Sequence, residues 1–175
     1  INAGVAEQNM MGLAAGLASE GVRPFVYSIA NFPTFRCAEQ VRNDVAYHNL
    51  PVVIVSVGGG LSYGNMGYSH HAVQDFSLMR SMPNMRIFAP GDPVELNKGF
   101  DKLIEYDGPT YLRLGRGGED NIHSSLNSSI YPGTIIKVVD KQSTRLVLST
   151  GASLKYAVSE NYAFFEKDYD VASMP

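Results

Sequence analysis

The residues with the clearest chemical potential in this chain are one glutamate, a pair of histidines and a few arginines near the ends of apolar segments. Glu7 stands at the start of a helix rich in small residues, Met10 to Ala18. A carboxylate at a helix start is stabilised by the free N–H groups and the helix dipole, so a structural role explains it. If Glu7 is instead buried beside a ring nitrogen, its pKa rises, and the neutral carboxyl can donate a proton.

Two adjacent histidines, His70 and His71, follow a polar segment over residues 61–69 that has the composition of a loop. Histidine exchanges protons near neutral pH, so either ring could move a proton in a reaction. Arg36 follows a short turn after an apolar segment. It is either a surface charge or an anion contact, and the sequence leaves both roles open.

An alternation of helices and strands must position these residues. Helices are predicted over Glu7–Ser19, Phe35–Asn49, His70–Met82 and from Asp92 or Pro93 to Tyr106, and strands over Pro24–Ile29, Pro51–Val57, Met85–Ala89 and Thr110–Leu114. This order predicts an α/β fold, a mostly parallel sheet with helices on both faces. Ligands bind beyond the carboxyl ends of such strands, so the expected site is formed by the loops Asn31–Arg36, Gly58–Ser69 and Gly115–Asp120.

The chain is predicted to contain one domain and the start of another. The first covers residues 1–117, a linker rich in Gly, Ser and Asn covers 118–133, and a second α/β unit covers 134–175. The second unit has strands predicted over Thr134–Val139, Arg145–Ser149 and Tyr169–Ser173, and a helix over Leu154–Phe165. It is too small to bury a core alone, and the first unit opens on a helix with no strand before it. We interpret the chain as an internal segment or an incompletely represented subunit that lacks the N-terminal strand and helix of its first domain.

Composition narrows the classes of partner. The 175 residues are 45% hydrophobic and 18% charged, which is ordinary for a globular protein. A net charge of −3 argues against nucleic acid or an anionic membrane as the main partner. The single cysteine, Cys37, excludes an internal disulfide and a zinc cluster, so we expect a reducing, cytoplasmic setting.

Five segments in order along the chain carry a more specific pattern. They are Gly4-Val5-Ala6-Glu7-Gln8, Asn31-Phe32-Pro33-Thr34-Phe35-Arg36, Arg42-Asn43-Asp44-Val45, Gly67-Tyr68-Ser69-His70 and Leu112-Arg113-Leu114-Gly115-Arg116. Together they resemble the pyrimidine-binding domain of the transketolase family of thiamine diphosphate enzymes. The resemblance covers about residues 1–117, and a weaker one to the family's C-terminal domain runs from Thr134 to the end.

The resemblance implies roles for particular residues. Glu7 matches the glutamate that holds a proton against N1′ of the cofactor's aminopyrimidine ring, and Phe32 and Phe35 match the aromatic residues around that ring. His70 matches a histidine that lines the substrate channel. Arg116 resembles the arginine that holds a sugar phosphate, because the guanidinium group bonds phosphate with two parallel donors.

Two further positions differ from the family's pattern or have no assigned role in it. His71 stands where the family usually has glutamine, and it joins Arg36 as a substrate-binding candidate. Arg113 has no ligand-facing motif around it, and a surface or interface role is predicted for it instead.

The resemblance also implies thiamine diphosphate and Mg²⁺ as cofactors. In the family a Gly-Asp-Gly…Asn stretch of a separate domain binds the metal and the diphosphate, and no Gly-Asp-Gly occurs here. The nearest string, Gly91-Asp92-Pro93, is interpreted as a helix-start turn. His123 is assigned a structural role, and no metal ligand is assigned. We therefore expect a diphosphate-binding partner half or subunit, in a homodimer or a heterotetramer.

The expected function is transfer of a two-carbon ketol unit between phosphorylated sugars. Two alternatives stay within the family: the β subunit of a two-oxoacid dehydrogenase decarboxylase and a deoxyxylulose-phosphate-synthase-like enzyme. A non-catalytic assembly partner is an alternative of another class. Met66 stands where transketolases of common sugar phosphates carry an aspartate, four residues before His70, so a modified or deoxygenated sugar is expected as the substrate.

Overall fold

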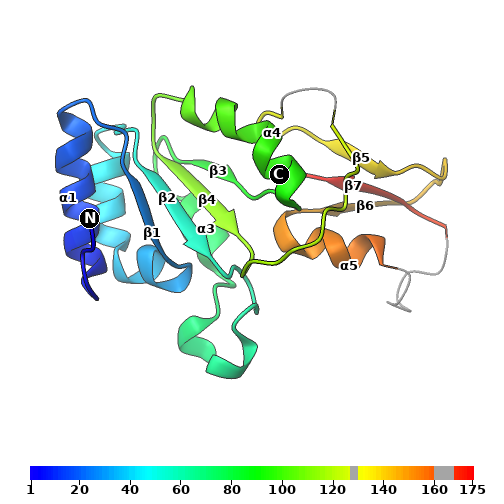
Figure 1. The fold of residues 1–175 in the computed structure, drawn as a ribbon, viewed down its shortest axis with the longest axis horizontal. Helices are drawn as coiled ribbons and strands as arrows, with labels where there is room; N and C mark the ends of the chain where they lie inside the picture. Colours follow the sequence, from blue (N-terminus) through cyan, green and yellow to red (C-terminus); the bar gives the residue numbers. More distant parts are fainter. Residues whose placement is uncertain (127–129, 160–167) are drawn as a thin grey trace. The chain divides into compact units, whose positions relative to one another are not determined.

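The computed structural model describes residues 1–126, 130–159 and 168–175, which form two compact units (Figure 1). The first comprises Ile1–Phe88 and Glu105–Gly117, and the second Ala89–Ile104 and Gly118–Pro175. This division differs in two respects from the predicted domain limits of 1–117, 118–133 and 134–175, because residues 89–104 and the predicted linker both group with the second unit. In the part of the chain that the structure describes, no helix is long and apolar enough to cross a membrane.

The first unit is built on a parallel sheet of four strands in the order β1-β2-β4-β3. Its strands are β1 (Phe25–Ile29), β2 (Val53–Val57), β3 (Arg86–Phe88) and β4 (Thr110–Leu114), and its α-helices are α1 (Glu7–Ser19), α2 (Ala38–Gln40) and α3 (Asp75–Arg80). Neighbouring strands run parallel throughout, with Val26 opposite Ile54 and Ile54 opposite Tyr111. The predicted α/β class with a parallel sheet is confirmed.

The core of this unit lies on one face of the sheet. Residues Val26, Ile54 and Tyr111 of three neighbouring strands share that face and are 5%, 0% and 0% exposed. Buried side chains of α1, of residues 37–46 and of α3 pack into the same cluster, which includes Met11 and Met79. Because side chains alternate along a strand, this core fixes the register of the strands and hence the edge at which their carboxyl ends meet.

The segment after β1 differs from the single helix predicted over Phe35–Asn49. It forms a π-helical turn, η1 (Phe32–Arg36), then α2, and then a second π-helical turn, η2 (Val41–Ala46). The hydroxyl of Thr34 donates a 2.7 Å hydrogen bond to the carbonyl of Ala30 and thereby ties η1 to the end of β1. Such π-turns occur frequently at functional sites because they widen the helix and redirect its side chains.

The predicted helix over His70–Met82 is also shorter in the structure. Two single 3₁₀ turns, η3 (Gly64–Met66) and η4 (Tyr68–His70), precede α3, which begins only at Asp75. The residues between, 71–74, return to the sheet through a pair of hydrogen bonds between Gly60 and Ala72 of 2.8 and 3.0 Å. His70 therefore lies on a loop that is closed at its base.

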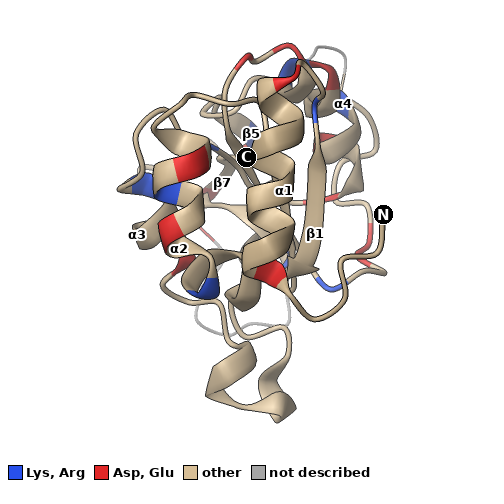
Figure 2. Ribbon diagram, turned by 90° about the vertical axis from the view of Figure 1, so that its left-hand side faces the viewer, with Lys and Arg blue, Asp and Glu red and all other residues tan. Residues whose placement is uncertain are grey.

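The middle of α1 is uncharged, as Figure 2 shows. Its sequence from Gln8 to Ser19 contains no charged residue. Gly12 and Gly16 are exposed, and a Cβ atom added at either would meet nothing within 4 Å among the described residues. The close packing against another backbone that small residues favour is therefore not formed at these glycines within the described chain.

The second unit contains α4 (Pro93–Ile104), a three-stranded sheet, the 3₁₀ turn η5 (Gly151–Ser153) and α5 (Leu154–Val158). The strands β5 (Ile136–Val139), β6 (Leu146–Ser149) and β7 (Asp170–Ser173) lie in the order β5-β7-β6, antiparallel and then parallel. The predicted helix over Leu154–Phe165 extends into residues 160–167, which lie outside the described part of the chain. Leu154, Ala157 and Val171 form the core of this unit.

Candidate functional site

The loops that follow β1 and β2 bring several of the predicted residues together. Phe32 and Arg36 lie on η1, and His70 lies on the 3₁₀ turn η4. The side-chain amide of Asn31 donates a 2.7 Å hydrogen bond to the carbonyl of Ser69, which joins the two loops. The rings of Phe32 and His70 meet edge to face, with their centroids 5.3 Å apart. The cluster therefore forms at the carboxyl edge of the sheet, where the strand order predicts a ligand site.

Glu7 joins this cluster from the first turn of α1. Its side chain is 9% exposed, and its Oε2 accepts a 2.6 Å hydrogen bond from Nη1 of Arg36. Burial acts to raise the pKa of the Glu7 carboxyl, but the hydrogen bond from Arg36, the backbone N–H of Glu7 and the Arg36 charge outweigh it, so the pKa lies below its usual range. This reverses the raised pKa that the sequence suggested, because a cation 29 residues away provides the counter-charge.

Arg36 also contacts the ring of Phe32. Its guanidinium carbon lies 4.5 Å from the centroid of the ring, within the range of a cation–π contact. Its side chain is 45% exposed, while its backbone carbonyl accepts a 3.0 Å hydrogen bond from the side chain of Gln8. The backbone of Arg36 is thus tied to α1, and its charged end reaches from solvent into the cluster.

Phe35 is placed differently from Phe32. It lies on the same turn, but it is 45% exposed, and therefore the two phenylalanines do not form a buried pair. His71 also points to a local role, because its Nε2 lies 3.1 Å from the carbonyl of Gly64 on its own loop. The structure leaves Phe32 and His70 as the two rings that meet each other, with Phe32 also in contact with the guanidinium of Arg36.

Arg116 lies beyond the end of β4 and is exposed. Its guanidinium carbon is 5.1 Å from the centroid of the Tyr63 ring, which in turn lies 6.3 Å from the ring of His70. Tyr63 was not predicted as a site residue. The glycine run at residues 58–60 could have indicated a closely packed neighbour, because Gly58 has a φ of +79° and the Tyr63 ring occupies the place of a Cβ atom there.

Arg113 holds the base of the His70 loop, and its side chain is 13% exposed, so the predicted surface role was wrong, while an interface role stays a prediction. Its Nε donates a 2.6 Å hydrogen bond to Oδ2 of Asp75, and its Nη2 donates a 2.9 Å hydrogen bond to the carbonyl of Ala72. The hydroxyl of Tyr111 donates a 2.7 Å hydrogen bond to the same Oδ2. Burial, reinforced by the adjacent Asp75 charge, raises the pKa of Tyr111, so its hydroxyl stays protonated as the donor. A charge within the apolar strand Thr110–Leu114 could have indicated such a partner.

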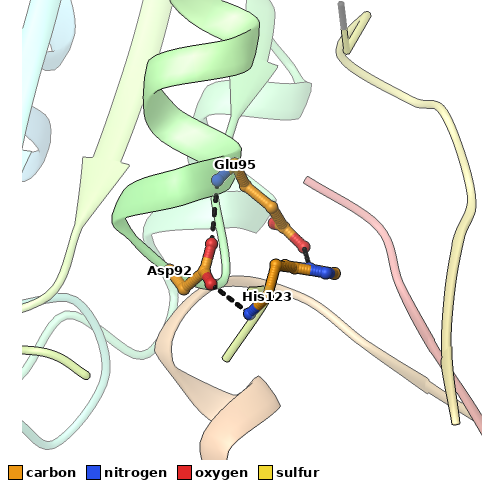
Figure 3. A group of neighbouring side chains, drawn as sticks. All are labelled: Asp92, Glu95 and His123. Carbon is orange, nitrogen blue, oxygen red and sulfur yellow. Dashed lines mark hydrogen bonds and ion pairs between the residues drawn. The ribbon is translucent and has the colours of Figure 1, made fainter. Parts of the chain in front are cut away.

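A second polar cluster, Asp92, Glu95 and His123, lies in the second unit (Figure 3). Asp92 caps α4, because its Oδ1 accepts a 2.8 Å hydrogen bond from the N–H of Glu95. Its Oδ2 accepts hydrogen bonds of 2.8 Å from the N–H groups of both Ile122 and His123. The oxygens of Glu95 face the N–H of Gly91 at 2.6 Å and Nε2 of His123 at 2.7 Å.

All four carboxylate oxygens of that cluster therefore have a partner without a metal ion. The three residues are buried, at 4%, 0% and 8% exposure, and they tie residues 122–123 to the start of α4. The cluster explains why residues 89–104 group with the second unit. It matches the predicted helix start at Gly91-Asp92-Pro93.

The first unit is thus an α/β domain whose candidate site lies at the carboxyl edge of a parallel sheet. Residues 1–118 match the family described as "Transketolase, pyrimidine binding domain". The chain therefore belongs to the transketolase family, and the family implies thiamine diphosphate as the cofactor.

Individual relatives support the same assignment. The chain is 36% identical over 157 residues to a putative transketolase C-terminal section of Methanocaldococcus jannaschii, covering 90% of this chain and 50% of that protein. It is 34% identical over 171 residues to a subunit of the apulose-4-phosphate transketolase of Actinobacillus succinogenes, covering 98% and 54%. Proteins named 1-deoxy-D-xylulose-5-phosphate synthase match as well. The chain spans about half the length of the first two relatives.

Among solved structures, the chain is similar to a split-gene transketolase described as an inactive β4 tetramer. The TM-score is 0.74 and the identity 31%, with 96% of this chain and 54% of that chain covered. The likeness thus extends over nearly all of this chain and about half of that one.

Proposed function

We propose that this chain is the pyrimidine-binding half of an enzyme that transfers a two-carbon ketol unit between sugars. The observation that carries the proposal is the buried carboxylate of Glu7 at the carboxyl edge of the sheet, joined through Arg36 to the ring of Phe32, which meets that of His70. The site already accepts a flat, nitrogen-bearing group, because the guanidinium of Arg36 lies on Phe32 and bonds Glu7. These residues therefore fit an aminopyrimidine ring.

When bound, thiamine diphosphate supplies an electron sink for breaking and forming carbon–carbon bonds. Glu7 would hold a proton at its carboxyl next to a ring nitrogen, and Phe32 would pack against the ring. His70, on the adjacent loop, would move a proton at a substrate hydroxyl, since imidazole exchanges protons near neutral pH. Arg116, at the exposed end of β4, would hold a phosphate. Phe35 and His71 would contribute less, because Phe35 is exposed and His71 bonds its own loop.

Mg²⁺ and the diphosphate would be held mainly by a partner domain or subunit. Two relatives are named as subunits of apulose-4-phosphate transketolases, and a similar split-gene protein forms an inactive β4 assembly. Both observations support a partner of this kind, and a homodimer or a heterotetramer would provide it. A cytoplasmic location belongs to the same proposal and is consistent with the single, buried Cys37.

The sugar is predicted to be a modified one. Met66, on η3 before His70, is 50% exposed, and its thioether is a weak acceptor for a sugar hydroxyl. The apulose-4-phosphate and 6-deoxy-6-sulfofructose transketolases among the relatives act, by their names, on unusual sugars. The assembled full-length enzyme, tested on a panel of sugars with liquid chromatography and mass spectrometry, should therefore turn over a modified sugar best. Efficient turnover of xylulose 5-phosphate with ribose 5-phosphate, at about 10⁴ M⁻¹s⁻¹ or more, would contradict this expectation.

The same panel separates the alternatives. Pyruvate with glyceraldehyde 3-phosphate tests the deoxyxylulose-phosphate-synthase-like reaction, and a two-oxoacid with a lipoyl-domain acceptor tests the decarboxylase reaction. If product forms with one of these pairs and none forms with two sugars, the activity is that reaction and not ketol transfer between sugars. A non-catalytic role predicts no product with any pair and no binding of thiamine diphosphate by the assembly.

Arg116→Ala should raise the KM for a phosphorylated substrate more than for its unphosphorylated analogue. Loss of a hydrogen bond to a charged group costs about 1.5–3 kcal/mol, or roughly ten- to a hundredfold in KM. Steady-state kinetics on the matched pair of substrates measure the difference, and Arg116→Lys should keep part of the phosphate preference. An equal rise in both KM values would show that Arg116 does not bind the phosphate.

A further inference from the structure

The guanidinium of Arg36 makes both contacts that the proposed function gives to the cofactor's pyrimidine ring. Its Nη1 lies 2.6 Å from Oε2 of Glu7, and its central carbon lies 4.5 Å from the centroid of the Phe32 ring. Guanidinium is flat and presents its N–H donors in the plane of the group, as an aminopyrimidine presents its ring nitrogens and amino group. Arg36 thus imitates the ligand at the carboxyl edge of β1.

These contacts are incompatible with proton donation by Glu7. An ionised carboxylate only accepts hydrogen bonds, and the one formed with Arg36 favours the ionised form. Besides Arg36, the groups that face Glu7 are the Ser28 hydroxyl from β1 and the Cys37 thiol. Burial raises the pKa of Cys37 to about 11, so the thiol is neutral near pH 7. Arg36 is therefore the cation that keeps Glu7 ionised.

The side chain of Arg36 is free to leave. It is 45% exposed, whereas its backbone is tied to α1 through the hydrogen bond from Gln8 to the Arg36 carbonyl. A rotation about the side-chain bonds moves the guanidinium to solvent without disturbing η1. Because the Arg36 side chain is 45% exposed, its charged end stays in water after it leaves, and a ring ligand replaces its contact with the buried Glu7.

We propose that Arg36 is a displaceable occupant of the pyrimidine site, which holds Glu7 and covers Phe32 until a ring ligand takes both contacts. The proposal rests on the proposed function, because it assigns the ligand of the same site. In the free protein the ion pair with Arg36 keeps Glu7 ionised. When Arg36 leaves, burial becomes the dominant influence on the pKa of the Glu7 carboxyl and raises it. The ring ligand that displaces Arg36 thus also converts Glu7 into a proton donor.

The direct test is the titration of the Glu7 carboxyl, followed by carbon-13 NMR in the full-length protein without cofactor. Because the folded pKa is lowered, the ion pair exists at neutral pH and is lost as the pH falls through that pKa. Arg36→Met keeps the apolar stem and removes the charge, so the midpoint for Glu7 should move to higher pH. Arg36→Lys should keep the low midpoint, and Arg80→Met, on the exposed last turn of α3, is the matched control. An unchanged midpoint in Arg36→Met would refute the proposal.

The second measurement is the affinity of the assembled enzyme for thiamine diphosphate, by calorimetry. Removing the Arg36 guanidinium increases the fraction of protein molecules whose pyrimidine site is open. Arg36→Met should therefore bind thiamine diphosphate about two- to fivefold more tightly. Weaker binding in Arg36→Met would show that Arg36 holds the cofactor and does not block its site. Arg36→Gln serves as a second neutral variant if Arg36→Met does not fold.

The two proposals fail in different ways. If Glu7 variants lose cofactor activation while the Arg36 variants leave the Glu7 titration unchanged, the occupant role is wrong and the proposed function stands. If the Arg36 variants shift the titration but Glu7 variants keep full activation, the proposed function is wrong.

Discussion

Replacing Glu7 by alanine is expected to abolish cofactor activation in the assembled enzyme and to leave the fold intact. The carboxyl of Glu7 is the buried group on α1 that could hold a proton against the ring, and proton transfer by a positioned side chain is typically worth about 10²–10⁴-fold. Exchange of the cofactor's C2 proton with deuterium, followed by proton NMR, measures activation without a sugar substrate. The rate should fall by at least about 10²-fold.

The fold should survive because Glu7 is not the N-cap residue of α1, which is Ala6. The substitution removes an acidic residue from the first turn of α1. Such a residue stabilises a helix by about 0.3–1 kcal/mol through the helix dipole. Arg36 is 45% exposed and returns to solvent. Glu7→Gln keeps the shape without the acid and should lose activation as well, and Glu20→Ala, at the exposed end of α1, should change nothing. Exchange at the wild-type rate in Glu7→Ala would rule out the assigned role.

Periodic elements of the first unit were predictable from the sequence. Residues 53–57 are apolar and β-branched apart from Ser56, which is typical of a strand buried on both faces of a parallel sheet. The first helix was predicted to run from Glu7 to Ser19, and it does so, because Gly21, at a φ of +85°, provides the left-handed residue that ends a helix. Local sequence determines these features.

Elements that depend on distant partners were not predictable in the same way. The π-turns at residues 32–36 and 41–46 replace the regular helix that the local pattern predicted. The first of these turns is preceded by Asn31, whose side chain bonds the Ser69 carbonyl, 38 residues away. The late start of α3 has the same origin, because Asp75 and Ala72 are held by Arg113 across a similar separation.

The candidate site shows the same division. In the fold, Arg36 joins Glu7 to Phe32, and the ring of Phe32 meets that of His70. The sequence identified Glu7, Phe32 and His70 as candidates through their resemblance to the family's motifs. It could not show that Arg36 would pair with Glu7 and lower its pKa, because that contact depends on how η1 meets α1. Residue types were thus accessible from the sequence, and protonation states were not.

Asp75→Ala is expected to destabilise the protein by about 3–5 kcal/mol, the cost of leaving a buried charge without its partner. The Asp75 side chain is 0% exposed, and that of Arg113 is 13% exposed. One oxygen of Asp75 accepts hydrogen bonds from both Arg113 and the hydroxyl of Tyr111, so the substitution leaves two buried donors unpaired. Denaturant unfolding of the full-length protein, with Asp107→Asn as a control in an exposed ion pair, measures the loss.

The destabilisation by Asp75→Ala should extend to the His70 loop, because Arg113 also bonds the Ala72 carbonyl at the base of that loop. Hydrogen exchange at the Gly60 and Ala72 amides, which pair with each other across the base, should therefore accelerate in Asp75→Ala. The double variant Asp75→Leu with Arg113→Met removes both charges and should recover much of the lost stability, since apolar replacement of a buried pair is often neutral. Asp75→Ala would contradict this account if it cost less than about 1 kcal/mol, the value of an exposed pair, and left both amides protected.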